Sequence, residues 1–277
     1  GATSGIGKGS GSGLSVFTGI MAFRCDGLVC LVTGATSGIG KASCAALARA
    51  GATIVAVGRH PERGAEIVQE VDKLSTSGAA CHFHAADLRS KDACESTAAA
   101  ALKLHGRVDA IIHAAGVFPT APVTETTDEM WADCMRVHAD AFFHLGRYLT
   151  QSMIERRSGV LVAIGSNYGV VGAANSAAYT ASKAALIGLC KSMALDLAPH
   201  NVRVNCVCPG ATNTGMLGGP DTAAKYAKAS PSREVAQPED VANAVVYLTS
   251  PASRMVRGIE LLVDGAETAG FQDPLAE

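Results

Sequence analysis

The chain has few aromatic residues and almost no net charge. Phe, Tyr and Trp make up 5% of its 277 residues, with a single Trp, and the formal net charge is −2. So little charge gives no electrostatic attraction to a phosphate backbone, and we expect no nucleic-acid partner. No apolar run approaches the ~18–20 residues that cross a bilayer, so we expect no membrane partner. The first twenty residues hold one Lys and no Arg, unlike a secretory signal peptide.

The nine cysteines are odd in number and form no C-x-x-C pair, which argues against a zinc site or a disulfide framework. Several lie in apolar, strand-like runs, as Cys206 and Cys208 do in NVRVNCVCPG. His82 and His84 share one side of an expected strand, but no nearby Cys or carboxylate completes a ligand set. We therefore expect buried free thiols, a reducing cytoplasmic location and no metal.

From residue 27 onward, short runs rich in β-branched residues alternate with longer Ala-rich stretches. The expected strands are residues 28–33, 52–57, 79–85, 108–113, 159–165, 202–207 and 259–263. The expected helices lie near residues 39–50, 61–76, 91–105, 127–156, 176–198 and 239–249. Strands that alternate with helices of this length form a parallel sheet covered on both faces. We predict the α/β class, as a single doubly wound Rossmann-type domain with about seven parallel strands flanked by helices.

The octapeptide GATSGIGK occurs twice, at Gly1–Lys8 and at Gly34–Lys41. A phosphate-binding loop needs a strand before it and a helix after it, so that free N–H groups and the helix dipole face the anion. Only the second copy has both, because the first runs into the flexible linker GSGSG. We expect residues 1–20 to be a flexible leader, a tag or duplicated artefact, that is dispensable for cofactor affinity. Residues 21–277 are expected to form the dinucleotide-binding domain.

The second copy, with the Thr before it, has the spacing T-G-x-x-x-G-x-G. A nucleoside-triphosphate loop of the Walker type requires Gly at Ala35 and Ser or Thr at Ala42, so that interpretation fails at both positions. In a dinucleotide loop, Gly34 allows the tight turn and Gly38 permits close approach of the backbone. Gly40 then lets the helix pack closely on the strand.

TGATSGIG resembles the cofactor loop of the short-chain dehydrogenase/reductase family, and other family motifs follow in order. They are Asp87-Leu88, H-A-A-G at 113–116, Ser166 ahead of Tyr179-x-x-x-Lys183, Pro209-Gly210 and V-D-G at 263–265. The resemblance covers residues 27–268 and includes 3-oxoacyl-carrier-protein reductases and carbonyl reductases. It implies a nicotinamide dinucleotide cofactor bound by Gly34, Thr36, Ser37, Gly38, Ile39, Gly40, Arg59, Asp87, Leu88, Ala115, Gly116, Tyr179, Lys183, Pro209, Gly210, Thr212 and Thr214.

The second expected strand ends in AVGRH, with Gly58 and Arg59 where enzymes that prefer NAD place a carboxylate for the ribose 2′-OH. No carboxylate repels a 2′-phosphate here, and the Arg59 guanidinium can pair with it. We predict NADP(H), with Ser37 as a second phosphate contact; the alternative is a solvated Arg59. The resemblance implies that Asp87 accepts a hydrogen bond from the adenine, and the alternative is that Asp87 caps the following helix.

Tyr179 and Lys183 lie on one face of the expected helix in SAAYTASKAALIGL. Ser166 follows a strand, at the edge where open α/β sheets bind their ligands. We predict that Tyr179 is the acid/base and that Ser166 holds the substrate oxygen. The Lys183 ammonium and an oxidised nicotinamide are expected to lower the Tyr179 pKa by ~2–3 from about 10. The alternative is a core Tyr beside a solvated Lys.

Three positions depart from the family pattern. By register, His138 takes the place of an Asn that orders a water chain to the lysine in many members, and we include His138 in the predicted catalytic set. His113 replaces the first Asn of N-N-A-G, which ties neighbouring strands, and is expected to do the same. Ala266 replaces a second Gly after V-D-G, with an expected minor effect.

The motifs predict an NADP(H)-dependent oxidoreductase that interconverts a ketone or aldehyde and the corresponding alcohol. One alternative is the reduction of 3-oxoacyl-carrier-protein, with Arg157 and Lys225 as candidate carrier contacts. The other is a non-catalytic dinucleotide-binding scaffold. Substrate selection is expected in Phe118-Pro119, Asn167-Tyr168 and residues 211–232, a segment with the composition of a lid.

The resemblance also implies a homotetramer, or a homodimer, of this chain. The long Ala-rich helices expected at 127–156 and 176–198 would pair across a two-fold axis.

Overall fold

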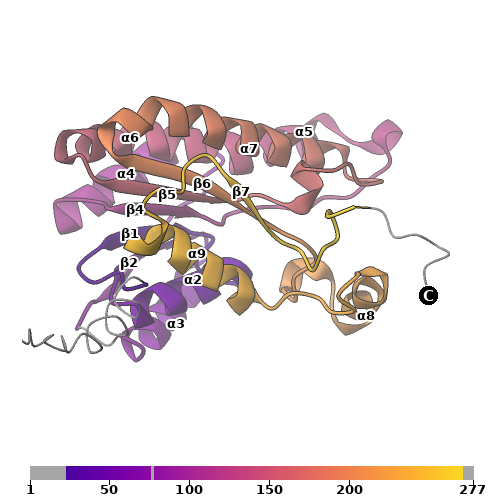
Figure 1. Cartoon of the computed structure of the whole chain (residues 1–277), viewed down its shortest axis with the longest axis horizontal. Coiled ribbons are helices and arrows are strands. Elements are labelled where there is room, and N and C mark those ends of the chain that lie inside the picture. Colours follow the sequence, from indigo (N-terminus) through magenta and orange to yellow (C-terminus); the bar gives the residue numbers. More distant parts are fainter. Residues whose placement is uncertain (1–22, 76–77, 271–277) are drawn as a thin grey trace, which may run out of the picture.

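The computed structural model describes residues 23–75 and 78–270. The expected leader at residues 1–20, with the first copy of the octapeptide, lies outside the described residues. The described part is a doubly wound α/β domain, which confirms the predicted fold (Figure 1).

Seven parallel strands form the sheet, in the order β3-β2-β1-β4-β5-β6-β7. Their bounds are β1 Val29–Thr33, β2 Thr53–Gly58, β3 Cys81–Ala85, β4 Ala110–His113, β5 Gly159–Ile164, β6 Val202–Pro209 and β7 Glu260–Val263. The sequences of the inner strands are nearly continuous apolar runs, because helices bury both faces of these strands. This is why the expected strands agree with the observed ones to within two residues at each end.

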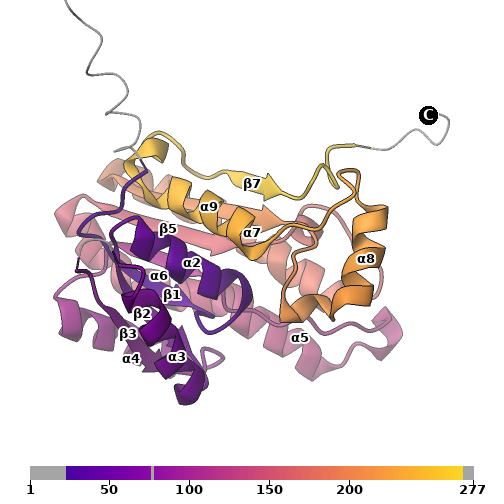
Figure 2. The same cartoon turned by 90° about the horizontal axis from the view of Figure 1, so that it is seen from below.

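Helices cover both faces of the sheet, with α4, α5, α6 and α7 on one side and α2, α3 and α9 on the other (Figure 1). Their bounds are α2 Gly38–Arg49, α3 Pro61–Asp72, α4 Lys91–His105, α5 Asp128–Met135, α6 Ala141–Arg156, α7 Ala177–Leu197 and α9 Pro238–Thr249. Among the described residues one further α-helix, α8 (Pro220–Ala229), lies beyond the end to which the β7 arrow points (Figure 2). Short 3-10 turns lie at Val123–Glu125, Asn167–Gly169, Ala198–His200, Gly215–Leu217 and Pro251–Ser253.

Alternate strand residues fill two separate cores. On β1, Leu31 packs with residues of α4, α6 and α7, whereas the next residue, Val32, packs with residues of α2 and α9. Ile111 and Ile112 of β4 divide in the same way, as the two-residue period of a strand requires. All nine cysteines are free and buried, which confirms the expected thiols.

The single helix expected over 127–156 is interrupted. A π-turn at Arg136–Asp140 separates α5 from α6. Turns of this kind add a residue to the helix and are frequent at functional sites. Here Val137 and His138 become buried while Arg136 and Asp140 stay exposed. The periodicity of the sequence does not reveal this insertion.

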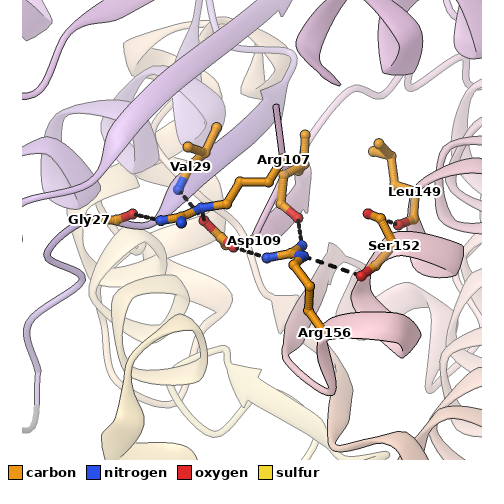
Figure 3. A network of polar contacts seen from close by, with 8 residues as sticks. Gly27, Val29, Arg107, Asp109, Leu149, Ser152 and Arg156 are labelled. Carbon is orange, nitrogen blue, oxygen red and sulfur yellow. Dashed lines mark hydrogen bonds and ion pairs between the residues drawn. The ribbon is translucent and has the colours of Figure 1, made fainter. Parts of the chain in front are cut away.

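At the amino ends of the strands, a nearly buried carboxylate ties three elements together (Figure 3). Asp109, just before β4, accepts hydrogen bonds from the Val29 N–H at 2.9 Å, from Arg107 at 2.9 Å and from Arg156 of α6 at 2.6 Å. Arg107 also donates to the Gly27 carbonyl at 2.7 Å. The network fixes the start of β1 and the end of α6 at the edge of the sheet where the strands begin.

Within residues 23–75 and 78–270, no helix is long and apolar enough to span a membrane.

Candidate active site

The strand order reverses between β1 and β4, and a groove opens there at the carboxyl ends of the strands. Two adjoining cavities of about 290 and 190 Å³ line this edge, and Gly116 borders both. Ligands of open α/β sheets bind at such switch points.

Gly34, Thr36 and Ser37 of the glycine loop between β1 and α2 line the smaller cavity. The predicted contacts Gly38 and Gly40 line neither of the two cavities. Gly34 and Gly38 have φ of +64° and +49°, and a Cβ on Gly34 would lie 2.8 Å from the Ala114 carbonyl oxygen. A Cβ on Gly40 would overlap the Gly34 carbonyl oxygen. The expected tight turn and close packing are therefore present. The first turn of α2 holds no acidic residue, and the Ser37 side chain makes no capping hydrogen bond. These residues fit a bound pyrophosphate.

The outer end of this cavity is rich in cations. Arg59, Arg63 and Arg89 all line it, together with Thr36, Ser37 and His60. Asp87 lies among them, and Arg89 donates to it bidentately, which lowers the pKa of the Asp87 carboxyl. Asp87 does not cap α4: the cap is Ser90, which accepts from the Ala93 N–H. The capping alternative for Asp87 is therefore wrong.

The larger cavity brings the predicted proton-transfer residues together. Ser166 follows β5, Tyr179 and Lys183 come from the first turns of α7, and all three line the cavity with His138. Lys183 is 4% exposed, donates to the Ile164 carbonyl at 2.8 Å and lies 5.6 Å from the Tyr179 ring centroid. The alternative of a solvated Lys183 is therefore wrong. Ser166 Oγ accepts from the Tyr168 N–H at 3.1 Å.

In the protein alone, the Tyr179 pKa moves opposite to the sequence-based expectation. Burial raises the pKa of Tyr179 to about 12, although a hydrogen bond with Ser166 lowers it. Burial also lowers the pKa of Lys183 from 10.5 to about 8. The physical reason is desolvation, which is the largest cause of both shifts and disfavours the charged form of each group.

His138 is fully buried and both of its ring nitrogens are engaged. Nε2 accepts from the Val117 N–H at 3.1 Å, so Nδ1 carries the proton and donates to Ser182 Oγ at 2.8 Å. Burial holds the pKa of His138 well below its usual value, and the nearby Lys183 ammonium adds to this. His138 is therefore a neutral link between the segment after β4 and α7.

His113 links neighbouring strands, β4 and β1, as expected. Its Nε2–H donates to the Val137 carbonyl at 2.9 Å, which leaves Nδ1 to accept from Thr33 Oγ1 of β1 at 2.9 Å. Thr33 Oγ1 in turn accepts from the Ala115 N–H. Burial lowers the pKa of His113 to about 4, so this link is also neutral.

The family model of the short chain dehydrogenases matches residues 28–224. The chain belongs to the short-chain dehydrogenase family. It is 35% identical over 250 residues to the cyclopentanol dehydrogenase of Comamonas testosteroni, which covers 89% of this chain and 99% of that protein. It is 32% identical to a 3-oxoacyl-[acyl-carrier-protein] reductase of Thermotoga maritima, with 87% and 98% covered. A solved 7α-hydroxysteroid dehydrogenase, complexed with NADH and an oxo bile acid, has a TM-score of 0.84 at 30% identity, with 92% and 98% covered.

As a short-chain dehydrogenase, the protein is an oxidoreductase of alcohols or ketones that uses a nicotinamide dinucleotide. The other predicted contact residues fall along the same groove. Arg59, Asp87, Leu88 and Ala115 line the smaller cavity; Ile39, Pro209, Gly210, Thr212 and Thr214 line the larger one.

The substrate side of this short-chain dehydrogenase is aromatic. Phe118 packs edge-on against Tyr179 with ring centroids 4.6 Å apart, and Tyr168 lies 6.4 Å from Tyr179. Tyr226 of α8 lines the same cavity, and burial together with the neighbouring Tyr226 raises the pKa of the Tyr168 hydroxyl. Among the described residues that line the larger cavity, Lys183 is the only Lys or Arg. The sequence analysis did not single out Tyr226. The only signal for this residue was its place in the expected lid, residues 211–232.

Two sequence-based expectations about this family member need correction. Arg157 precedes β5, whereas Ser166 follows it, so Arg157 lies at the opposite edge of the sheet and donates there to the Pro199 carbonyl. Ala266 adopts φ of +71°, a left-handed conformation that suits glycine. Its replacement of the family glycine is therefore not minor, because L residues other than Gly are strained there.

Proposed function

We propose that this short-chain dehydrogenase is an NADP(H)-dependent oxidoreductase that interconverts a ketone or aldehyde and the corresponding secondary or primary alcohol, with Tyr179 as the acid/base. The observation that carries the proposal is the convergence of Ser166, Tyr179 and Lys183 on one cavity wall beside the glycine loop. They come from two elements, and a buried Lys without a catalytic or binding task is rare.

Each residue has a distinct task in the reaction. Bound NADP(H) supplies or accepts the hydride. Tyr179 keeps its proton at neutral pH, because its pKa lies near 12, and gives it to the substrate oxygen during reduction. Lys183 remains an ammonium below its pKa of about 8 and stabilises the phenolate that the transfer leaves. Ser166 holds the substrate oxygen. His138 positions the cavity wall and relays no proton, since both of its nitrogens are engaged.

The preference for NADP(H) over NAD(H) rests on charge at the end of β2. Arg59 and Arg63 line the cavity where the family binds the ribose, and Ser37 lines the same space. Asp87, a carboxylate of that wall, is neutralised by Arg89. Asp133, the second carboxylate that lines this cavity, also pairs with Arg89, so a 2′-phosphate would meet Arg59 and Arg63 while Arg89 engages both carboxylates. Because a solved relative contains NADH, family membership alone does not choose the cofactor.

The substrate we propose is an uncharged ketone or alcohol of modest size. Phe118, Tyr168, Met216 and Leu217 give the cavity an apolar wall of about the right extent for a small ring, and Lys183 is held by the Ile164 carbonyl. The cyclopentanol dehydrogenase relative supports this class.

The first test measures consumption of NADPH and NADH with cyclopentanone, other ketones and a 3-oxoacyl-carrier thioester. We expect turnover with NADPH and none in Tyr179→Phe, which keeps the ring but lacks the proton. Arg59→Leu should raise the NADPH KM by about tenfold or more and leave the NADH KM unchanged, because only the 2′-phosphate needs the guanidinium. Arg157→Leu, at the opposite edge, is the matched control. Faster turnover of the wild type with NADH would refute the cofactor preference and leave the reaction intact.

Two alternatives are decided by the same assay. The carrier-protein reductase relative favours 3-oxoacyl-carrier thioesters, and a higher kcat/KM for the thioester than for every ketone would support that function. Lys225 of α8 is then the remaining candidate carrier contact. Binding of NADPH without turnover of any compound would support a non-catalytic scaffold.

We also propose a homotetramer in a reducing cytoplasm. Trp131 of α5 and Phe143 and Tyr148 of α6 are each more than two-fifths exposed, and Leu195 of α7 is 79% exposed. Apolar exposure of this kind is typical of an interface. The nine free thiols suit a reducing compartment. Light scattering that gives the mass of a monomer would refute the assembly.

A further inference from the structure

A chain of three hydrogen bonds crosses from the segment after β4 to the helix that carries Tyr179. The Val117 N–H donates to His138 Nε2 at 3.1 Å, and His138 Nδ1–H donates to Ser182 Oγ at 2.8 Å. Ser182 Oγ in turn donates to the Tyr179 carbonyl at 2.7 Å. Ser182 and His138 are both 0% exposed. Ser182 lines neither of the two cavities, and the proposed reaction gives it no task.

The direction of every bond in this chain is fixed. Burial keeps the pKa of His138 well below its usual value, so the ring is neutral and carries one proton. A backbone N–H only donates, so Nε2 must accept from Val117 and the ring proton lies on Nδ1. The Ser182 hydroxyl accepts that proton because its own hydrogen is committed to the Tyr179 carbonyl. One tautomer of His138 therefore satisfies the whole chain.

The segment that His138 holds separates the two cavities. Gly116 borders both cavities, Val117 lines the smaller one and Phe118 lines the larger one. A Cβ on Gly116 would lie 3.1 Å from His138 Nε2, so the imidazole packs directly against this segment. The place of the wall between cofactor and substrate therefore depends on where the His138 ring lies.

The Tyr179 ring contacts two side chains that this chain places. Its centroid lies 4.6 Å from that of Phe118, which meets it edge-on, and 5.4 Å from that of His138, with perpendicular ring planes. Aromatic rings in these geometries attract each other. His138 is oriented by Ser182 and holds the backbone next to Phe118. A change at Ser182 should therefore reach the Tyr179 ring through both of these contacts.

We propose that Ser182 is a positioning residue for the reaction, which acts through His138 on the wall between the two cavities and on the Tyr179 ring. The inference rests on the proposed function, in which Tyr179 is the acid/base. Ser182 itself meets Tyr179 at the backbone carbonyl, away from the reacting hydroxyl. A small misplacement of reacting groups lowers the rate of transfer far more than it weakens binding. The effect of Ser182 therefore falls on kcat.

Substitution of Ser182 by Ala removes the hydroxyl and leaves the helix intact. In Ser182→Ala, the Nδ1–H of His138 is buried without an acceptor, or the proton moves to Nε2 and faces the Val117 N–H. Either outcome leaves a buried donor unsatisfied and favours displacement of the ring. We expect kcat to fall about tenfold. The KM of the ketone and the Kd of NADPH should change by less than about threefold.

A double-mutant cycle shows whether Ser182 acts through His138. His138→Phe keeps a flat ring against Tyr179, removes both ring hydrogen bonds and should lower kcat at least as much as Ser182→Ala does. In the double variant H138F/S182A, loss of the hydroxyl should change kcat by less than about twofold relative to His138→Phe. The reason is that no ring proton remains for the hydroxyl to accept. Independent roles would instead multiply the two losses.

Ser192→Ala is the matched control, because Ser192 lies on the same helix and is exposed. It should leave kcat unchanged, and thermal unfolding should show that every variant is folded. A wild-type kcat in Ser182→Ala, or a loss in the double variant equal to the product of the two single losses, would overturn the inference and leave the proposed function standing. A wild type that turns over no alcohol or ketone with either cofactor would overturn both.

Discussion

Replacement of Lys183 by Met is expected to abolish turnover and, at the same time, to stabilise the protein at neutral pH. Lys183 is 4% exposed, and burial lowers its pKa from 10.5 to about 8. At 1.36 kcal/mol per pKa unit, keeping the ammonium in the folded state costs about 3 kcal/mol at pH 7. Met has a similar length and no charge. The variant also loses the hydrogen bond from Lys183 to the Ile164 carbonyl, and this loss offsets about 1 kcal/mol of the gain in stability.

The gain in the free energy of unfolding of Lys183→Met should depend on pH in a defined direction. In the unfolded chain Lys183 loses its proton near pH 10.5, whereas in the folded chain it does so near pH 8. The ammonium therefore opposes folding fully below about pH 8, and the opposition fades as the pH rises toward 10.5. The advantage of Lys183→Met over the wild type should shrink by about 1 kcal/mol between pH 7 and pH 9.

The assay is urea-induced unfolding at pH 7 and pH 9, at one protein concentration and without cofactor. The expected net gain in the free energy of unfolding is about 2 kcal/mol at pH 7. In a thermal melt the same gain would raise the Tm by roughly 4–8 °C for a domain of this size. Lys191→Met is the control, since Lys191 lies on the same helix, has a 52% exposed side chain and pairs with Glu260 at 3.1 Å. Equal or lower stability of Lys183→Met at both pH values would refute the argument that burial of the ammonium is costly.

Three further changes have outcomes that the structure determines. Ala266→Gly should raise the free energy of unfolding by about 1 kcal/mol, because φ of +71° strains Ala but not Gly; an unchanged denaturation midpoint would contradict this. Gly40→Ala should weaken NADPH binding by more than about tenfold in fluorescence titration, because its Cβ overlaps the Gly34 carbonyl oxygen, whereas Gly172→Ala, with open space around it, should not. Asp109→Ala should lower the free energy of unfolding by about 3 kcal/mol with no change in NADPH affinity, because it breaks a nearly buried ion network at the far edge of the sheet; a loss of affinity in the folded variant would argue against that separation.

Local pattern was enough to predict the fold and the place of the groove. The apolar runs of β1 and β4 and the glycine loop after β1 are signals contained within a few residues, because a parallel strand buried on both faces has little choice of composition. The spacing of Tyr179 and Lys183 puts them on one helix face for the same local reason. The roles of these residues in the reaction remain predictions, tested by the Tyr179→Phe and Lys183→Met variants.

Other features depend on contacts between segments distant in sequence. Arg89 pairs with Asp133, 44 positions further along the chain, as well as with its neighbour Asp87. The π-turn that buries His138 follows from packing against α7, where Ser182 accepts from its ring. The raised pKa of Tyr179 reflects the desolvation created by Phe118, Tyr168 and their neighbours, which exists only after folding.

Short-range periodicity and motifs a few residues long therefore account for the α/β fold, the family and the residues gathered at the carboxyl edge. The tertiary structure was needed to show which groups stay neutral in that site. It also showed that the Glu267 carboxylate binds Asn167, the residue after Ser166. Glu267 and Asn167 are separated by 100 positions in the chain yet share a hydrogen bond of 2.7 Å. Protonation and hydrogen-bond direction depend on burial and on the full set of neighbours, and these exist only when the sheet has brought its loops together.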